Sequence, residues 1–381
     1  MSTGFFNKKL VMEKKELTYI LGAGASFQSI PIVKTFSSRF NDFLLWIDRD
    51  IIKDNGFSAD VKQKFGILYE LGNDLHKSFE SHQSFDTYFK KLFHTGQKDK
   101  ISEGKKVLNL YFIWEHLSLP VVKPEKYDEY AFWKESSIDK RYDALIAGLL
   151  RPIPDQKEPY CKVNFITWNY DLNLLMSLKN YFSPNATITD FFNQINKNNG
   201  LWQVEEKITV INMNGFFYCS YFNDLESLQR RNIHDIIYSK IKNQNYFDSL
   251  ITNNLHEYTA NNVDTDAELI KFAWEKSELS HLIAKDKIDE SKNIVIIGYT
   301  FPLYNRLVDL SYLEQSVISN RSIFVQDPKA DTIRQNLLDY YQLNDNDSLE
   351  RSLKAVKDCD SFYIPSDIFG VKDSTGNYYF V

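Results

Sequence analysis

Five short apolar runs, separated by segments with helical periodicity, constrain the fold of this chain more than any other feature. Each run is rich in β-branched or aromatic side chains and predicts a buried strand. The runs cover residues 17–21, 163–167, 208–213, 293–297 and 322–325. Because helical segments stand between them, we expect the strands to run parallel, with the helices as crossovers. The sequence therefore predicts an α/β protein with a doubly wound, Rossmann-like parallel sheet.

The long segments between these runs predict two insertions into the sheet. Residues 48–154 have helical periodicity and few strand signals, which indicates a helical insertion. Residues 216–287 are polar and aromatic, and they indicate a second, helical or irregular insertion with a mobile loop near residues 259–265. The α/β core is then expected to combine residues 1–47, 155–215 and 288–381.

Helices in these segments are predicted from apolar residues spaced three and four apart. Ser84 is the expected N-cap of one helix, and Asp86 is favourable in its first turn. The charged residues 96–104 are expected to form a loop. The expected helices cover residues 35–47, 84–93, 107–117, 141–146 and 339–349.

Composition and charge exclude several kinds of protein. The net charge is −6 over 381 residues, which does not suit a nucleic-acid coat, and no apolar run approaches the ~20 residues of a membrane span. Cys161, Cys219 and Cys359 lie far apart, without a C-x-x-C pair, which argues against a zinc ribbon or a disulfide framework. We expect a cytoplasmic protein with no bound metal, no membrane segment and no direct reader of nucleic acid.

The first strand ends in a glycine turn, Gly22-Ala23-Gly24-Ala25-Ser26, and a helical pattern follows. Strand, glycine turn and helix form the layout that binds nucleotide phosphates, because glycine lets the backbone approach the phosphate and the helix N-terminus attracts its charge. The backbone N–H groups of Ala25 and Ser26 are the expected donors. The third glycine of the dinucleotide fingerprint is missing, so a plain βα turn is the alternative.

Polar residues or glycines also follow the other four strands. They are Thr167-Trp168-Asn169-Tyr170-Asp171, Asn214-Gly215, Gly298-Tyr299-Thr300-Phe301 and Gln326-Asp327-Pro328. Ligands of parallel sheets bind beyond the carboxyl ends of the strands, so this coincidence favours a nucleotide site over a plain turn. Structural alternatives stay open at single positions: Asn169 as a turn cap, Asp327 as the start of a turn, and Tyr299 and Phe301 as packing residues.

In their order and spacing, these segments resemble the sirtuin-like NAD-consuming domain of bacterial antiviral defence proteins. The resemblance covers residues 18–327 and extends to the stand-alone members encoded beside a HerA-like hexameric ATPase. It implies an NAD+ hydrolase that cleaves the nicotinamide–ribose bond, releases ADP-ribose and nicotinamide, and depletes cellular NAD during phage infection. It also implies NAD as the substrate, no metal, and a large assembly with that ATPase.

The resemblance implies a role for each matching position. Asn169 would orient the nicotinamide ribose and the attacking water, and Asp171 would lie near the carboxamide. These roles suit the chemistry, because nicotinamide departs as a neutral molecule and needs no acid, whereas the ribose gains oxocarbenium character. The residues implied for binding are Gly22, Ala23, Gly24, Ala25 and Ser26 at the pyrophosphate, Thr167, Tyr170 and Gly215 beside the ligand, Gly298 and Thr300 at the adenosine, and Asp327 at a ribose hydroxyl.

One position departs from that family. Asn214 stands where the family usually has the histidine that acts as base, and an amide takes up no proton at neutral pH. Three explanations stay open: the protein binds NAD without turnover, another group is the base, or a histidine was deliberately replaced to trap NAD. None of the seven histidines follows a strand end, so we expect surface or core roles for them.

Two other functions compete with hydrolysis. A binding module for NAD or ADP-ribose is favoured by Asn214, because such a module needs no base. A protein deacylase is disfavoured by the missing zinc ribbon.

The aromatic residues, at 15% of the chain, suit a large core or a subunit interface. Phe93, Tyr111, Trp114 and Phe132 are candidates for an interface on the helical insertion, with packing inside the insertion as an equal alternative. Because no sensor domain is evident, we expect a homo-oligomer whose activity is controlled by assembly or by the ATPase.

Overall fold

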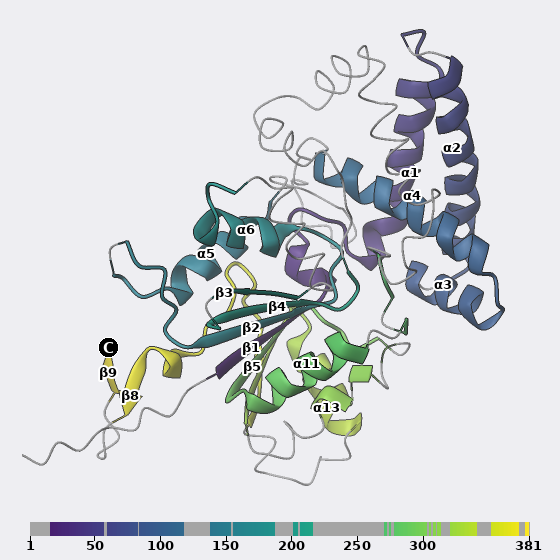
Figure 1. Cartoon of the computed structure of the whole chain (residues 1–381). Coiled ribbons are helices and arrows are strands. Elements are labelled where there is room, and N and C mark those ends of the chain that lie inside the picture. The colour runs from purple at the N-terminus through teal and green to yellow at the C-terminus, as the bar shows by residue number, and fades with distance from the viewer. Residues whose placement is uncertain are drawn as a thin grey trace, which may run out of the picture.

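A seven-stranded sheet forms the centre of the computed structural model, in the order β3-β4-β2-β1-β5-β6-β7 (Figure 1). Every neighbouring pair of strands is parallel except β3 and β4. The strands are β1 (Glu16–Leu21), β2 (Lys162–Thr167), β3 (Leu201–Val204), β4 (Ile208–Asn212), β5 (Asn293–Ile297), β6 (Ser322–Gln326) and β7 (Leu353–Val356). The structure describes residues 16–56, 59–82, 84–117, 138–153, 155–186, 201–204, 206–215, 270–272, 274–275, 278–302, 305, 308–309, 311–313, 321–340, 352–372 and 378–380.

The five predicted strands are β1, β2, β4, β5 and β6, and they lie side by side in the middle of the sheet. The sequence did not reveal β3 and β7, the two edge strands. Each is four residues long and only partly buried, so it lacks the continuous apolar pattern of the central strands. The predicted α/β fold with a Rossmann-like parallel sheet is confirmed.

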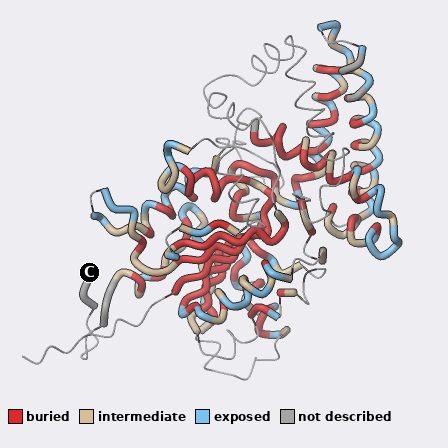
Figure 2. The backbone as a smooth tube through the Cα atoms, viewed as in Figure 1, coloured by how far each residue is buried: buried red, intermediate tan, exposed pale blue. Residues whose placement is uncertain are grey.

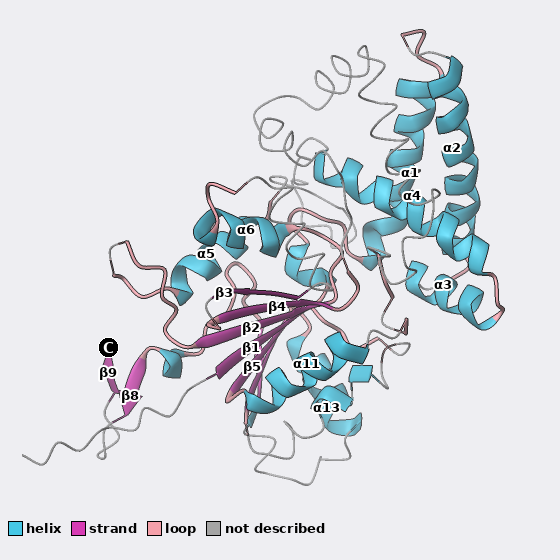
Figure 3. Ribbon diagram, in the orientation of Figure 1, coloured by secondary structure: helices cyan, strands magenta, loops and turns pink. Residues whose placement is uncertain are grey.

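Side chains along the strands alternate between two cores, one on each face of the sheet. On β1, Leu17, Tyr19 and Leu21 belong to one core and Ile20 belongs to the other. Helices α5 (Lys140–Leu149) and α6 (Asn173–Phe182) cover the first face, whereas α11 (Glu278–Glu290) and α13 (Ala330–Tyr340) cover the second (Figure 3). Figure 2 shows the strands almost entirely buried, as expected for a doubly wound sheet covered on both faces.

A layer of four helices lies next to the carboxyl ends of the strands: α1 (Val33–Trp46), α2 (Ala59–Glu80), α3 (Phe85–His94) and α4 (Lys98–Leu117) (Figure 1). After α1 the helical path continues as a short π-helix, Ile47–Ile52. The helices surround an aromatic core in which the Tyr111 ring lies 5.0 Å from Phe36 and 5.3 Å from Phe40. Ser84 caps α3 as predicted, since its Oγ accepts a hydrogen bond from Thr87 N at 3.2 Å.

The predicted loop at residues 96–104 is wrong from Lys98 onward, because α4 begins there and continues through Gly104. A Cβ at residue 104 would lie 2.5 Å from the Phe89 ring, so glycine allows α3 and α4 to approach closely. The charges of the segment also do not require a loop, because Lys98, Asp99, Lys100 and Glu103 lie exposed on the helix. The predicted helices at 107–117 and 141–146 are confirmed as parts of α4 and α5.

Some predictions lie wholly or partly outside the described residues. These are the mobile loop at 259–265, residues 341–349 of the predicted last helix, and Phe132. Among the other interface candidates, Tyr111 and Trp114 are buried in the helical layer, so packing inside the insertion holds for both. Phe93, at the end of α3, is 49% exposed.

Candidate functional site

The five central strands bring their carboxyl ends to one edge of the sheet, next to the helical layer. From β1 the chain passes to β2 and β4 on one side, and later to β5 and β6 on the other. The strand order therefore reverses beside β1, and ligands of doubly wound sheets bind at such a reversal. The glycine turn after β1 lies at this point, against the turn that follows β5.

Contacts between the two backbones explain the glycines of both turns. Gly22 N donates to Ile297 O, and Gly24 N donates to Gly298 O, both at 3.0 Å. Gly298 has φ +60°, and a Cβ there would lie 2.3 Å from the carbonyl carbon of Gly24. The close packing of the two turns and the left-handed φ of Gly298 thus account for these glycines without a ligand. Ala25 N, a predicted phosphate donor, donates to Gly22 O at 2.9 Å within the turn.

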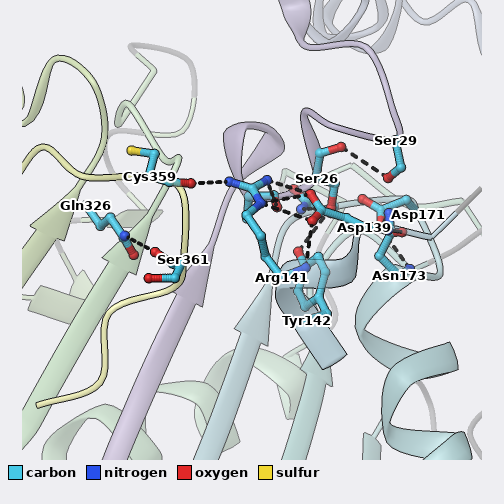
Figure 4. Close-up of polar contacts among 12 residues, drawn as sticks. Ser26, Ser29, Asp139, Arg141, Tyr142, Asp171, Asn173, Gln326, Cys359 and Ser361 are labelled. Carbon is cyan, nitrogen blue, oxygen red and sulfur yellow. Dashed lines mark hydrogen bonds and ion pairs between the residues drawn. The ribbon is translucent and has the colours of Figure 1, made fainter. Parts of the chain in front are cut away.

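Ser26 joins the glycine turn to the loop after β2. Its Oγ accepts a hydrogen bond from Asn169 Nδ2 at 3.3 Å and lies 3.0 Å from Tyr142 Oη, and the Ser26 side chain is close enough to lower the pKa of the Asp171 carboxylate. Asn173 donates to the same carboxylate from its backbone N at 2.9 Å and from Nδ2 at 2.7 Å. Figure 4 shows Ser26, Tyr142, Asp171 and Asn173 gathered at this point. We call Ser26, Asn169 and Asp171 the Ser26 junction; the sequence predicted all three as site residues.

Burial sets the protonation states at the Ser26 junction. It raises the pKa of Asp171, against hydrogen bonds from Asn173 and Ser26 that lower it. It also raises the pKa of Tyr142 well above the ordinary value, and the nearby Asp171 carboxylate adds to that rise. Tyr142 therefore keeps its proton, and it shares with Ser26 a hydrogen bond in which either hydroxyl can donate. A carboxylate with a raised pKa is a better proton acceptor than an ordinary one.

A buried ion pair that the sequence did not reveal supports the Ser26 junction from α5. Asp139 is the N-cap of α5, and its carboxylate accepts a hydrogen bond from Arg141 Nε at 3.0 Å. Arg141 also donates to Ala25 O at 2.9 Å and to Cys359 O at 3.0 Å, which ties the glycine turn to the C-terminal segment (Figure 4). The partners in these contacts are 116 and 218 residues apart in the sequence, so no local pattern predicts them. A local signal was available in Asp139, because an aspartate directly before a helix is typical of an N-cap.

Asn214 follows β4 and is 6% exposed. Its Nδ2 donates to Trp168 O at 2.7 Å, which places it beside the loop that carries Asn169. Its Oδ1 is buried and has no hydrogen-bond partner within the part of the chain that the structure describes. A buried acceptor without a donor is costly, so this oxygen marks a position where a ligand hydroxyl or a water would bond. Gly215, with φ +66°, turns the chain directly afterwards.

Two predicted binding residues of the loop after β2 have supporting contacts instead. Thr167 Oγ1 accepts a hydrogen bond from Asn169 N at 3.1 Å, which shapes the loop. Tyr170 Oη donates to Asp86 Oδ1 at 3.1 Å, so its side chain reaches toward the helical layer.

The loops after β5 and β6 complete the row of strand ends. Gly298 N donates to Gln326 O at 3.0 Å, which joins these two loops. Asp327 Oδ1 accepts from Lys329 N at 2.8 Å, the contact expected of a residue that starts a turn. Thr300 and Ala23 are exposed. The predicted residues thus lie along one edge in the order Asn214, Asn169, Gly24, Gly298 and Asp327.

Within the described ranges, no group of three or more His, Cys, Asp or Glu side chains could hold a metal ion. In the same residues, no helix has the length and apolar character needed to cross a membrane. Comparison with protein-family models finds no match, and comparison with curated proteins finds no relative. The geometry of the strand ends is therefore the basis for inferring what the chain does.

Proposed function

We propose that the carboxyl edge of the sheet binds NAD+ and that the chain hydrolyses its nicotinamide–ribose bond. The observation that carries this proposal is the Ser26 junction, where the Asn169 amide bonds the hydroxyl of the glycine turn and the buried Asp171 carboxylate lies beside that hydroxyl, which lowers its pKa. The junction lies beside the reversal of strand order, where dinucleotides bind in doubly wound sheets. A pyrophosphate at the glycine turn would leave the nicotinamide ribose next to Asn169 and Asp171.

The reaction needs orientation and charge rather than an acid. Nicotinamide leaves as a neutral molecule, and the Asp171 carboxylate stabilises the oxocarbenium character that develops on the ribose. Because Asn169 Nδ2 is bonded to Ser26, its Oδ1 is oriented to accept a hydrogen bond from the attacking water. The water adds to C1 of the ribose, and its proton passes to the Asp171 carboxylate. The products are ADP-ribose, nicotinamide and one proton.

Asn214 has a binding role in this scheme. Its amide cannot act as a base, but its buried Oδ1 would accept a hydrogen bond from a ribose hydroxyl. Asp171 then takes the place of the histidine that the resembled family has at this position. Of the three explanations for an asparagine at position 214, the proposed mechanism adopts the second, in which another group is the base.

Nicotinamide release and calorimetric titration with NAD+ test the proposal together. Asn169→Ala removes the amide that orients the water, so release is expected to fall about 100-fold while the melting temperature changes little. Asn73→Ala is the matched control, because that amide donates to Tyr69 O within α2. Equal release by Asn169→Ala and the unmodified chain would contradict the mechanism, and failure of the unmodified chain to bind NAD+ would contradict the site.

A binding module for NAD+ or ADP-ribose is the second candidate, and Asn214 favours it. An amide in the place of a base leaves a site that binds without turnover. Tight NAD+ binding without nicotinamide release would establish this candidate over the hydrolase. Release that requires an acetylated peptide would instead establish a deacylase.

The proposed hydrolase acts in antiviral defence by depleting NAD, as a homo-oligomer controlled by a HerA-like hexameric ATPase. Phe93 is the exposed member of the predicted interface residues that the structure describes. Light scattering tests the oligomer, and a strict monomer at micromolar concentration contradicts it. Equal rates of NAD turnover with and without the ATPase would remove that partner from the proposal.

A further inference from the structure

A short strap, residues 270–272 with 274–275, holds the loop that carries Asn214. Lys271 N donates to Asn214 O at 2.7 Å, and Ile270 forms an antiparallel bridge with Gly215. Ile270 and Phe272 are buried, so the strap is packed into the protein on both sides of Lys271. The strap thus fixes the backbone of the residue whose amide oxygen has no partner.

Glu275 closes the strap into a turn and ties it to α4. Its backbone N donates to Phe272 O at 2.8 Å, while its Oε2 accepts from Phe272 N at 2.9 Å, so the two residues are bonded in both directions. The same carboxylate accepts two hydrogen bonds from Lys105 Nζ, at 2.9 and 2.8 Å. Lys105 lies in α4 and is 2% exposed, so its charge is compensated inside the protein.

Aromatic rings reinforce the connection between the strap and the helical layer. Phe272 stacks on Trp274 with ring centroids 4.7 Å apart, and on Phe89 of α3 at the same distance. Lys105 Nζ lies 5.5 Å from the centre of the Phe272 ring. The strap is therefore bound to both α3 and α4.

The same two helices hold the loop after β2. Tyr170 donates to Asp86 of α3 and stacks on Phe112 of α4 at 5.4 Å. Leu172 N donates to His116 Nε2 of α4 at 3.3 Å. Helices α3 and α4 thus fix the two loops that carry the polar residues of the site, one directly and one through the strap.

We propose that Lys105 and Glu275 are positioning residues, which hold Asn214 in register with the Ser26 junction through the strap. This inference rests on the proposed function of that site. A buried ion pair adds little net stability compared with apolar packing, so stability gives a weak reason for placing two charges here. Fixing the position of the strap is a stronger reason for the pair. Glu275 accepts a hydrogen bond from Phe272 N, and the neighbouring Lys271 donates from its backbone N to the Asn214 carbonyl.

A pair of variants separates positioning from stability. Lys105→Met leaves the Glu275 carboxylate, which is 23% exposed, without its cation and is expected to lower the melting temperature. Adding Glu275→Gln removes the uncompensated charge and keeps an acceptor for Phe272 N, so the melting temperature is expected to recover. The double variant still lacks the bond from α4 to the strap. Its kcat/KM for nicotinamide release is therefore expected to stay about tenfold or more below that of the unmodified chain.

Hydrogen exchange gives a second readout that needs no NAD+. Peptides that contain Lys271 are expected to exchange faster in Lys105→Met and in the double variant, because Lys271 N loses its fixed acceptor. Arg39→Met is the matched control: it breaks the pair that Arg39 Nε forms with Glu115 at 2.8 Å in the same helical layer. It is expected to lower the melting temperature without changing exchange at Lys271.

The outcomes distinguish the inference from the proposed function. If the double variant recovers nicotinamide release and slow exchange together with its melting temperature, the pair is merely structural and the inference is overturned. If the unmodified chain neither binds nor cleaves NAD+, the proposed function fails. In that case, faster exchange at Lys271 in the variants still supports the link through the strap, and unchanged exchange refutes it.

Discussion

Asp309 is predicted to make the stability of this protein fall as pH rises from acid to alkaline. The carboxyl group is 4% exposed; its Oδ1 accepts from Tyr299 Oη at 2.7 Å, and its Oδ2 has no hydrogen-bond partner among the described residues. Burial raises its pKa from the ordinary value of 3.8 to about 7, against the opposing bond from Tyr299. Tyr299 in turn packs on Trp168, with ring centroids 5.2 Å apart, so this carboxyl lies close beneath the proposed site.

The sign and size of the effect follow from proton linkage. The pKa of Asp309 is higher in the folded protein than in the unfolded chain. The contribution of Asp309 to stability is therefore complete below pH 3.8 and is lost as pH rises to about 7. A shift of this size corresponds to about 4 kcal/mol of unfolding free energy in total. About half of that loss is expected between pH 5 and pH 8. Asp309→Asn, which cannot ionise, is therefore expected to be more stable than the unmodified chain by about 2 kcal/mol more at pH 8 than at pH 5.

Urea unfolding of both proteins at the two pH values measures this difference directly. Asp74→Asn is the matched control, because the Asp74 side chain in α2 is 81% exposed. Parallel changes in the unfolding free energy of the unmodified chain and of Asp309→Asn between pH 5 and pH 8 would refute the reasoning. They would mean that Asp309 is solvated, or stays charged with a partner, in the folded state.

Three further substitutions test other parts of the structure. Gly298→Ala combines a left-handed φ with a backbone clash and is expected to cost about 3 kcal/mol in thermal or urea unfolding, whereas Gly96→Ala, at φ +70° in open space, should cost only about 1 kcal/mol. Arg141→Met leaves the Asp139 carboxylate buried without its cation, so a loss of about 3–5 kcal/mol is expected in the same assay. Asn214→His separates the two proposed functions: if Asp171 is the base, nicotinamide release is expected not to rise, because the ribose hydroxyl loses its amide acceptor, whereas a gain of about 100-fold would show that the unmodified chain lacks a base.

The central sheet was predictable because burial on both faces makes a strand apolar along its whole length. The run at residues 293–297 matches β5 at both ends, and the other central strands match to within one residue. Edge strands lack this signal: β7 reads Leu-Lys-Ala-Val and is mostly half-buried or exposed. The start of α4 was not predicted for a related reason: the charges at Lys98, Asp99 and Lys100 indicated a loop, whereas these side chains lie exposed on the first turn of the helix.

The site was predictable where its residues follow strand ends, and unpredictable where they come from distant segments. Parallel strands bring their carboxyl ends together whatever the loops contain, so Ser26, Asn169 and Asn214 could be placed at one edge from sequence alone. Arg141 and Tyr142 reach the same place from α5, through contacts that depend on how that helix packs on the sheet. Such contacts leave no periodic or local trace in the sequence.

The charges along the strand ends indicate how a dinucleotide would lie in the site. Arg141 bonds the glycine turn at Ala25 O, but Asp139 compensates its charge. Because Gly22 N, Gly24 N and Ala25 N are already bonded within the protein, a pyrophosphate there would meet neither an unpaired cation nor these N–H groups, and the exposed Ala23 is where it could approach the turn. Beyond Ser26 the row carries the Asp171 carboxylate together with the amides of Asn169 and Asn214. A positive nicotinamide ribose is favoured near this carboxylate, and a phosphate is disfavoured. The row thus favours one orientation of NAD+, with the scissile bond on the β2 and β4 side of the glycine turn, where the helical layer and the strap hold both asparagine loops.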